Sequence, residues 1–328
     1  MTTALAGRNF LPAPCFDPTA GNLVRGPLHG EPGYWAGAPG AVYDPGGDRF
    51  LLLYRVRRPR GVVPDRGAEI RILTSRDGLT FDGELYCLEK RALGSPSIER
   101  CALVQVEPDR WVLFVSYVDP TDHRWRIDRL EASRPDAFNP QQRQPVLLPG
   151  RLGVEGVKDP FVFRVGGLWH MIVSFATATA PADPAQLHGT ADAYNTGLIR
   201  SATGLAVSSD ALHWEWVGEV FGPRRTGWDR YCSRISTVWR QDGLWYAFYD
   251  GSASVEENYE ERLGLAFSAD LRRFERLTPN GPLLTAPYGS GSVRYADVLD
   301  APGRGRFVYY EVVRPDGAHE LRAQRLDR

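Results

Sequence analysis

The fold is decided by a short stretch at residues 46–54, which reads Gly46-Gly47-Asp48-Arg49-Phe50-Leu51-Leu52-Leu53-Tyr54. A tight turn leads here into a strand rich in aromatic and apolar residues, a sequence typical of β-structure. The pattern returns four more times, and its leading aromatic residues are Phe50, Trp111, Trp169, Trp245 and Phe307. They are 61, 58, 76 and 62 residues apart, so five similar units cover most of the 328-residue chain.

A second motif, Ser-x-Asp, follows a strand-like run in three of these units. Its members are Ser75/Asp77, Ser208/Asp210 and Ser268/Asp270. The Asp can accept hydrogen bonds from nearby backbone N–H groups, which predicts a structural turn between strands. Each unit of roughly 60 residues then has room for a four-stranded antiparallel sheet. Radial repetition of such sheets protects their edges and predicts an all-β, five-bladed β-propeller.

The predicted propeller forms one domain, 1–328. Its blades are expected at 34–83, 97–140, 157–218, 231–277 and 292–328, with the N-terminal segment closing the last blade. The spacing of 76 indicates an insertion in the third unit, at 176–202. We interpret it as a long loop over one mouth of the propeller, either a functional lid or a disordered segment.

Composition excludes several classes of protein. The 39 Lys and Arg residues are balanced by 40 Asp and Glu residues, without the basic excess of a nucleic-acid binder. No apolar run is long enough for a transmembrane helix, and residues 1–13 lack the apolar region of a secretory signal, so we expect a cytoplasmic protein. No metal-binding motif is present, and no metal or cofactor is expected. The scattered cysteines, expected as free thiols, are Cys15, Cys87, Cys101 and Cys232.

Charged residues directly precede four of the five predicted inner strands. In a propeller these strand starts converge at one mouth of the central channel. Carboxylates beside aromatic residues suit a sugar, because aromatic faces stack on sugar rings and two carboxyls can act as acid and base. The alternative is a polar plug, in which the carboxylates only pair with basic neighbours.

These features resemble the five-bladed glycosidase superfamily, which includes glycoside hydrolase families 43, 32 and 130. The first unit is most similar to family 130, at residues 39–43, 51–56 and 74–81. Lys158-Asp159-Pro160 is similar to the Lys-Asp motif of family 130 and to the Arg-Asp-Pro motif of family 32. The resemblance implies a carbohydrate substrate met at the heads of the inner strands.

The chain departs from family 130 at two motifs. The family's Glu-Asp-Pro-Arg motif, whose Asp supplies the proton, is replaced by Ile98-Glu99-Arg100-Cys101, which leaves only Glu99 as a carboxylate. The family's Tyr-His-Gly motif, whose His helps to hold phosphate, is Tyr249-Asp250-Gly251. An Asp there would repel phosphate, which favours hydrolysis. Arg55, Arg57, Arg58 and Arg234 could still supply an anion-binding pocket, so phosphorolysis remains an alternative.

We therefore predict a glycoside hydrolase, inverting in mechanism, with Asp159 and Glu99 as the acid/base pair and Asp250 as a further carboxylate of the site. The residues predicted to bind the sugar are Trp35, Arg55, Arg100, Lys158, Tyr231, Arg234, Arg294, Tyr295 and Asp297. A phosphorylase of mannoside type and a non-catalytic propeller that binds carbohydrate or protein are the alternatives. The acidic stretch 256–261 is either a solvated loop or part of the mouth, and His170 and His319 are expected to be structural.

Overall fold

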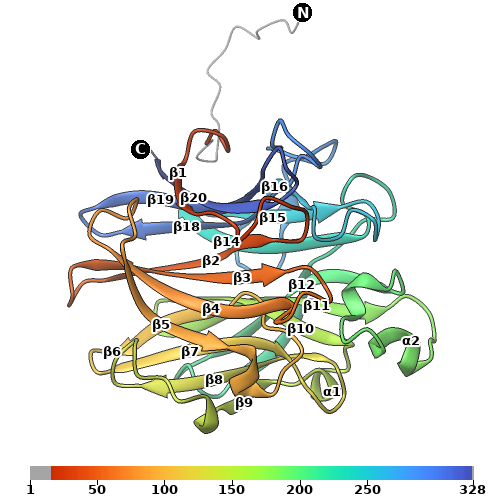
Figure 1. The fold of residues 1–328 in the computed structure, drawn as a ribbon, viewed down its shortest axis with the longest axis horizontal. Coiled ribbons are helices and arrows are strands. Elements are labelled where there is room, and N and C mark those ends of the chain that lie inside the picture. Colours follow the sequence, from red (N-terminus) through yellow and green to blue (C-terminus); the bar gives the residue numbers. More distant parts are fainter. Residues whose placement is uncertain (1–15, 327–328) are drawn as a thin grey trace, which may run out of the picture.

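The computed structural model describes residues 16–326 as an all-β chain built mainly of antiparallel sheets (Figure 1). Residues 1–13 and Cys15, on which the signal and thiol predictions partly rest, lie outside the described residues. Within 16–326, no helix is both long and apolar enough to span a membrane. Cys87, Cys101 and Cys232 form no disulfide.

The strands form successive antiparallel groups along the chain. The first contains β2 (Trp35–Asp44), β3 (Arg49–Arg58), β4 (Arg66–Ser75) and β5 (Gly83–Glu89). The next contains β6 (Ala102–Glu107), β7 (Arg110–Val118), β8 (Trp125–Ala132) and β9 (Gln144–Leu147). They are followed by β10 (Gly156–Val165), β11 (Leu168–Ala178), β12 (Ile199–Ser208) and β13 (Glu215–Phe221).

The C-terminal half continues the pattern with β14 (Cys232–Gln241), β15 (Leu244–Ser252), β16 (Arg262–Ser268) and β17 (Glu275–Arg276). The last group contains β18 (Val293–Ala301), β19 (Gly305–Val313) and β20 (His319–Leu326). The short strand β1 (Asn22–Arg25) pairs with β20, so both ends of the described chain meet in this group (Figure 1). The helices are α1 (Pro149–Leu152), α2 (Pro184–His188), η1 (Lys90–Leu93), η2 (Pro140–Gln142) and η3 (Ala193–Asn195).

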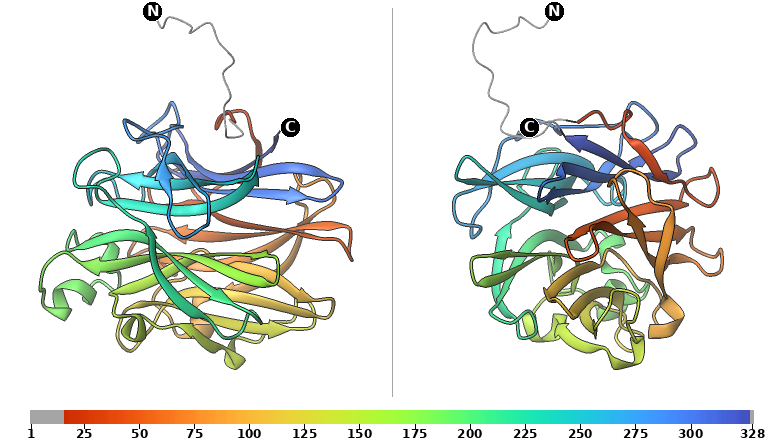
Figure 2. Two further views of the ribbon diagram at one scale, coloured as in Figure 1. Left: turned by 180° about the vertical axis from the view of Figure 1, so that it is seen from behind. Right: turned by 90° about the vertical axis from the view of Figure 1, so that its left-hand side faces the viewer.

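The first strand of each group lies on the inside of the molecule. These strands contact one another in a cycle that runs β2, β6, β10, β14, β18 and back to β2. Figure 2 shows the groups following one another in chain order around a common centre. The all-β class and the antiparallel sheets are confirmed, and the count of five blades stays an interpretation.

The repeated sequence unit corresponds to the second strand of each group. Its leading aromatic residues stand near the starts of β3, β7, β11, β15 and β19. The Ser-x-Asp motifs form the predicted turns. In the first of them, Asp77 Oδ1 accepts hydrogen bonds from the N–H groups of Leu79 and Thr80, both at 2.8 Å. The same local contacts recur at Asp210 and Asp270.

The insertion of the third group is shorter than the predicted 176–202. Strand pairing extends to Ala178, which faces Ile199, because this hairpin continues beyond the sheet's other strands. We call the remaining residues, 179–198, the covering segment. It contains α2 and η3, and the Asp183 carboxylate caps α2 by accepting the Ala185 N–H at 2.9 Å.

Backbone irregularities mark the heads of the inner strands. Pairing slips by a register shift in β2, β10, β14 and β18, each time within the first half of the strand. Three non-glycine residues here have left-handed backbones: Ala38 (φ 52°), Asp159 (φ 57°) and Tyr295 (φ 51°). Such conformations cost about 1–3 kcal/mol and concentrate at functional sites.

Candidate functional site

Tyr295, at the head of β18, joins all three predicted catalytic carboxylates. Its hydroxyl donates to Glu99 Oε2 at 2.9 Å and lies 3.4 Å from Asp159 Oδ2. Its backbone N–H donates to Asp250 Oδ1 at 3.0 Å. We call Tyr295, Glu99, Asp159 and Asp250 the Tyr295 cluster. All four side chains are buried.

Asp159 is the least satisfied carboxylate of the Tyr295 cluster. Its backbone is left-handed, and it lies in the register shift of β10 between the paired residues Lys158 and Phe161. Lys158 Nζ lies 3.5 Å from Asp159 Oδ2, whereas Asp159 Oδ1 is buried and has no hydrogen-bond partner. A buried carboxylate oxygen without a donor is costly unless a ligand or water meets it. Asp159 therefore has an oxygen free to act on a bound molecule.

Glu99 is held as an ion by its surroundings. Both of its carboxylate oxygens accept from Arg55 Nη1. Burial alone would raise the pKa of Glu99, but the charges of Arg55 and Lys158 outweigh it and lower this pKa to about 2. Glu99 is therefore ionised at neutral pH and is neutralised by arginine, which limits its use as a proton donor.

Asp250 behaves in the opposite way. Burial raises the pKa of Asp250 to about 7, against the attraction of Arg234 and with repulsion from Glu261 adding to the rise. Asp250 thus holds a proton at slightly acid pH, while Glu99 does not. A carboxyl group that keeps its proton close to neutral pH is suited to act as a general acid.

The raised pKa of Asp250 makes a prediction about stability. The folded protein keeps this proton up to about pH 7, whereas the unfolded chain releases it near pH 3.8. The folded state binds the extra proton in this window, so the contribution of Asp250 to the free energy of unfolding falls as pH rises through it.

Asp250→Asn cannot titrate and keeps an acceptor for the Tyr295 N–H. We expect the variant to gain stability over wild type between pH 5 and 8, by on the order of 1 kcal/mol or more. Urea unfolding across that range measures this; a constant difference would contradict it.

Two buried glutamates, Glu261 and Glu311, were not among the predicted site residues. Glu261 accepts from Arg234 and, at 2.9 Å, from Arg294 Nη1. It belongs to the acidic stretch 256–261, and this end of the stretch is buried rather than solvated. The signal for Glu311 was a lone carboxylate inside the apolar strand β19.

Glu311 anchors several inner-strand heads. Its carboxylate accepts from Arg294 Nη2 at 2.7 Å, from the Ala38 N–H at 2.9 Å and from His319 Nδ1 at 2.7 Å. Gly37 makes room for it, because a Cβ there would lie 1.9 Å from Glu311 Oε2. Burial lowers the pKa of His319, but its contacts with Glu260 and Glu311 outweigh burial and raise it. His319 thus bridges Glu260 and Glu311.

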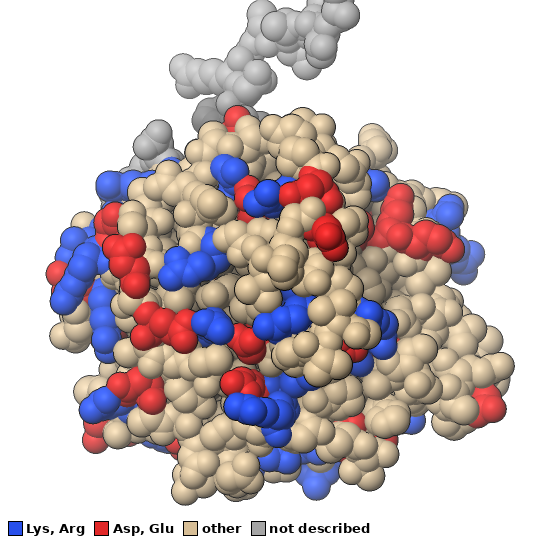
Figure 3. Space-filling model, in the orientation of Figure 1, with Lys and Arg blue, Asp and Glu red and all other residues tan. Residues whose placement is uncertain are grey.

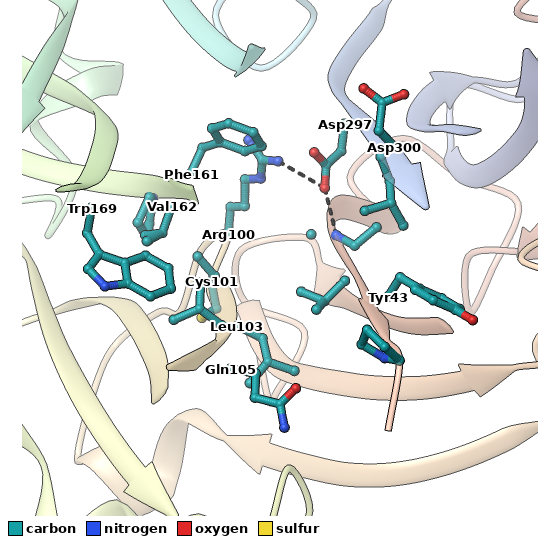
Figure 4. A pocket seen from close by; sticks show the side chains of 18 of the residues that line it. Tyr43, Arg100, Cys101, Leu103, Gln105, Phe161, Val162, Trp169, Asp297 and Asp300 are labelled. Atoms are coloured by element: carbon teal, nitrogen blue, oxygen red, sulfur yellow. Dashed lines mark hydrogen bonds and ion pairs between the residues drawn. The ribbon is translucent and has the colours of Figure 1, made fainter. Parts of the chain in front are cut away.

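Two predicted sugar-binding residues lie at a different cavity. Arg100 and Asp297 face one another at 3.5 Å (Figure 4). They line a cavity of about 400 Å³ with Ala41, Phe161 and Trp169, and no member of the Tyr295 cluster lines it. Burial raises the pKa of Asp297 to about 6, although Arg100 opposes this. The predicted set is therefore divided between two places.

The covering segment contacts the site through Asp192 and Tyr194. Asp192 accepts from Trp125 Nε1 at 3.0 Å and from the Tyr259 hydroxyl. The Tyr194 ring lies 4.6 Å from Lys158 Nζ. The Tyr194 carbonyl accepts from the Tyr231 hydroxyl at 2.8 Å, so Tyr231 holds this segment. The four side chains of the Tyr295 cluster are buried in this structure.

The arginines of the predicted anion pocket have different roles. Arg55 and Arg234 pair with Glu99 and Glu261. Arg58 points elsewhere, because it pairs with Glu69 at 3.2 Å. Over the described range, no three His, Cys, Asp or Glu side chains are grouped so that they could hold a metal ion. The face in Figure 3 mixes basic and acidic side chains without separating them.

These observations define the class of the protein. It is all-β, and the heads of its inner strands converge on buried carboxylates. No protein-family model matches the sequence, and no curated protein matches it. A thermostable family-43 glycoside hydrolase matches with a TM-score of 0.61 and 14% identity, over 89% of this chain and 90% of that one.

Two further solved structures match to a similar extent. One is from a study of the GH130 family of mannoside phosphorylases, stated to contain glycoside hydrolases that target β-1,2-mannosidic linkages in Candida mannan (TM-score 0.61, 14% identity, 95% of each chain). The other is the β-1,2-mannobiose phosphorylase from Listeria innocua with β-1,2-mannobiose (TM-score 0.59, 14% identity, 91% and 92%). The chain has the fold of the propeller glycosidases, as the sequence resemblance predicted.

Proposed function

We propose that this chain is a glycoside hydrolase whose catalytic centre is the Tyr295 cluster. The observation that carries the proposal is Asp159, a buried carboxylate on a left-handed backbone with one unpartnered oxygen. Strain of this kind persists where the surrounding structure enforces it, and active sites are a common place for it. The fold shared with glycosidases supports a carbohydrate as the ligand.

The proposal includes a single domain of five blades. The closed cycle of contacts among β2, β6, β10, β14 and β18 supports it, because each of these strands is followed along the chain by its antiparallel partners, while single parallel pairs join β20 to β2 and β12 to β14. Sugars would be met at the heads of these strands, where Trp35, Lys158 and Arg234 lie with the Tyr295 cluster.

We assign the general base to Asp159 and the general acid to Asp250. The free oxygen of Asp159 would take a proton from a water as that water attacks the anomeric carbon. Asp250, protonated near neutral pH, would give its proton to the departing glycosidic oxygen. Their contacts are with opposite ends of Tyr295, its hydroxyl and its backbone N–H, so this residue stands between the two carboxyl groups. Separated carboxyls, roughly 6.5–9.5 Å apart, are what an inverting mechanism requires.

Glu99 then positions rather than reacts. The sequence paired it with Asp159 as acid and base, but its ion pair with Arg55 favours a fixed negative charge. The Glu99 carboxylate accepts a hydrogen bond from the Tyr295 hydroxyl. It thereby orients Tyr295, which contacts both Asp159 and Asp250. Because the Tyr295 cluster is buried, the covering segment would have to move to admit a sugar.

Two alternatives make different predictions. Phosphorolysis is favoured by the fold shared with a mannobiose phosphorylase, and a non-catalytic role is favoured by the Arg55–Glu99 pair. We expect the purified protein to release nitrophenol from at least one member of a panel of aryl mannosides, glucosides, xylosides, arabinofuranosides and uronides, at a rate independent of inorganic phosphate. Phosphate-dependent release with a sugar 1-phosphate as product would identify a phosphorylase. Binding of a sugar with no turnover in either condition would identify a binding protein.

A further inference from the structure

Arg57, near the end of β3, is the exception among the cations at the mouth. The neighbouring guanidinium groups all have carboxylate partners: Arg55 with Glu99, Arg234 with Glu261, and Arg294 with Glu261 and Glu311. Among residues 16–326, Arg57 makes no ion pair and no side-chain hydrogen bond, and its Nε is buried without a partner. Buried N–H donors on a charged group normally make hydrogen bonds, so a buried arginine donor without a partner indicates that an acceptor is missing.

Aromatic rings hold the Arg57 guanidinium in place. Its Cζ lies 4.1 Å from the centre of the Trp35 ring and 5.0 Å from that of Tyr259. Contacts of this kind orient a guanidinium while leaving its N–H groups available in the plane. Burial and the nearby charge of Arg55 lower the pKa of Arg57, as expected for a cation that lacks a counter-ion.

The place of Arg57 connects it with the Tyr295 cluster. The centre of the Trp35 ring also lies 5.6 Å from Arg55 Cζ and 4.6 Å from Arg294 Cζ. The Trp35 Nε1 is buried without a hydrogen-bond partner. Tyr259, whose ring also contacts Arg57, donates a hydrogen bond from its hydroxyl to Asp192 of the covering segment. Arg57 is partly exposed, unlike Arg55, so part of this side chain is accessible to a ligand between Trp35 and Tyr259.

We propose that Arg57 binds the carboxylate of an acidic sugar, and thus that the substrate is a uronate-type glycoside. A guanidinium fork matches a carboxylate with two parallel hydrogen bonds. One unpaired cation matches one negative charge, whereas a phosphate dianion would face the ionised Glu99, Glu261 and Glu311. The inference deepens the proposed function and rests on it for the sugar, but its test measures binding and not turnover.

The test is a calorimetric titration of the full chain with methyl glycosides of glucuronate, galacturonate and mannuronate, each against its neutral counterpart. We expect at least one uronate to bind tenfold or more tightly than its neutral counterpart. Arg57→Gln should weaken that uronate by about tenfold to a hundredfold and leave the neutral sugar unchanged. Arg58→Gln is the matched control, because Arg58 is the next residue of β3 and pairs with Glu69.

Equal affinity for uronate and neutral sugar in the wild type, or binding of neither, would overturn the inference. So would equal losses in the two variants. Inorganic phosphate that displaces the uronate at lower concentration, and only when Arg57 is present, would assign the anion to a phosphate co-substrate instead. Arg57→Lys, which keeps the charge and removes the fork, guards against a folding defect. Turnover of a neutral glycoside that depends on Asp159 would leave the proposed function standing even if the uronate inference fails.

Discussion

Asp159→Asn is expected to lower kcat/KM for a cleaved glycoside by about 10²–10⁴-fold, the contribution of one positioned acid or base. The amide keeps the size of the carboxyl group but cannot take a proton from water. Asparagine also tolerates the left-handed backbone of this position (φ 57°) better than most residues do. The melting temperature should therefore stay close to that of the wild type while turnover is lost.

The matched control for Asp159→Asn is Asp128→Asn. Asp128 is another buried carboxylate, bound by the Tyr117 hydroxyl at 2.8 Å and by Arg126, on β8 and outside the Tyr295 cluster. We expect this variant to lose stability and to keep kcat/KM within a factor of a few. Near-normal turnover by Asp159→Asn would remove Asp159 from the mechanism, and equal losses in both variants would show that any buried carboxylate matters.

The repeat could be predicted because its causes are local. A turn followed by alternating aromatic and branched residues is written in consecutive positions, as at Phe50 and Trp245, and each copy forms the second strand of a group. The Ser-x-Asp turns are equally local, since Asp77 bonds residues two and three positions ahead. Local chemistry of this kind needs no knowledge of the three-dimensional arrangement.

The site was only partly predictable because its contacts are not local. Asp159 and Tyr295 were identified from their place at the heads of inner strands, and the structure joins them across 136 residues. No sequence pattern predicts that Arg55 contacts Glu311, 256 residues away, or that Glu261 pairs with both Arg234 and Arg294. Arg100 and Asp297 line a second cavity instead, and Asp297 comes directly after the register shift of β18, which the sequence does not reveal.

The covering segment shows the same limit at a smaller scale. The spacing of 76 residues between Trp169 and Trp245 predicted a long insertion, but its two ends could not be placed within a few residues. Strand pairing from Ala176 to Ala178 shortened it, and this pairing is set by the partner strand β12. That Asp192 would bind Trp125 and Tyr259, on two other strand groups, is a property of the closed fold.

Glu311→Gln is expected to be the most destabilising single isosteric change in the buried network, at about 3–5 kcal/mol of the free energy of unfolding. The glutamine keeps the volume next to Gly37 but removes the charge that Arg294, Arg55 and His319 share. Three cationic groups would then be buried with one fewer counter-ion, and burial without a counter-ion costs far more than a lost surface contact.

The pH dependence of this difference separates charge from packing. Burial raises the pKa of Glu311, but Arg294 and His319 outweigh it and hold this pKa well below its usual value of 4.5. The stabilisation by the ionised Glu311 is therefore fully present above about pH 4.5 and declines as pH falls below it, because the unfolded chain takes up the proton first. Urea unfolding should show that the difference in the free energy of unfolding between wild type and Glu311→Gln narrows from pH 6 to pH 3.

The control is Glu219→Gln, which breaks the partly exposed pair with Arg200 and should cost only about 0–1 kcal/mol of the free energy of unfolding. A Glu311→Gln loss no larger than the Glu219→Gln loss, or one that is constant with pH, would mean that the ionised Glu311 does not hold the inner-strand heads together.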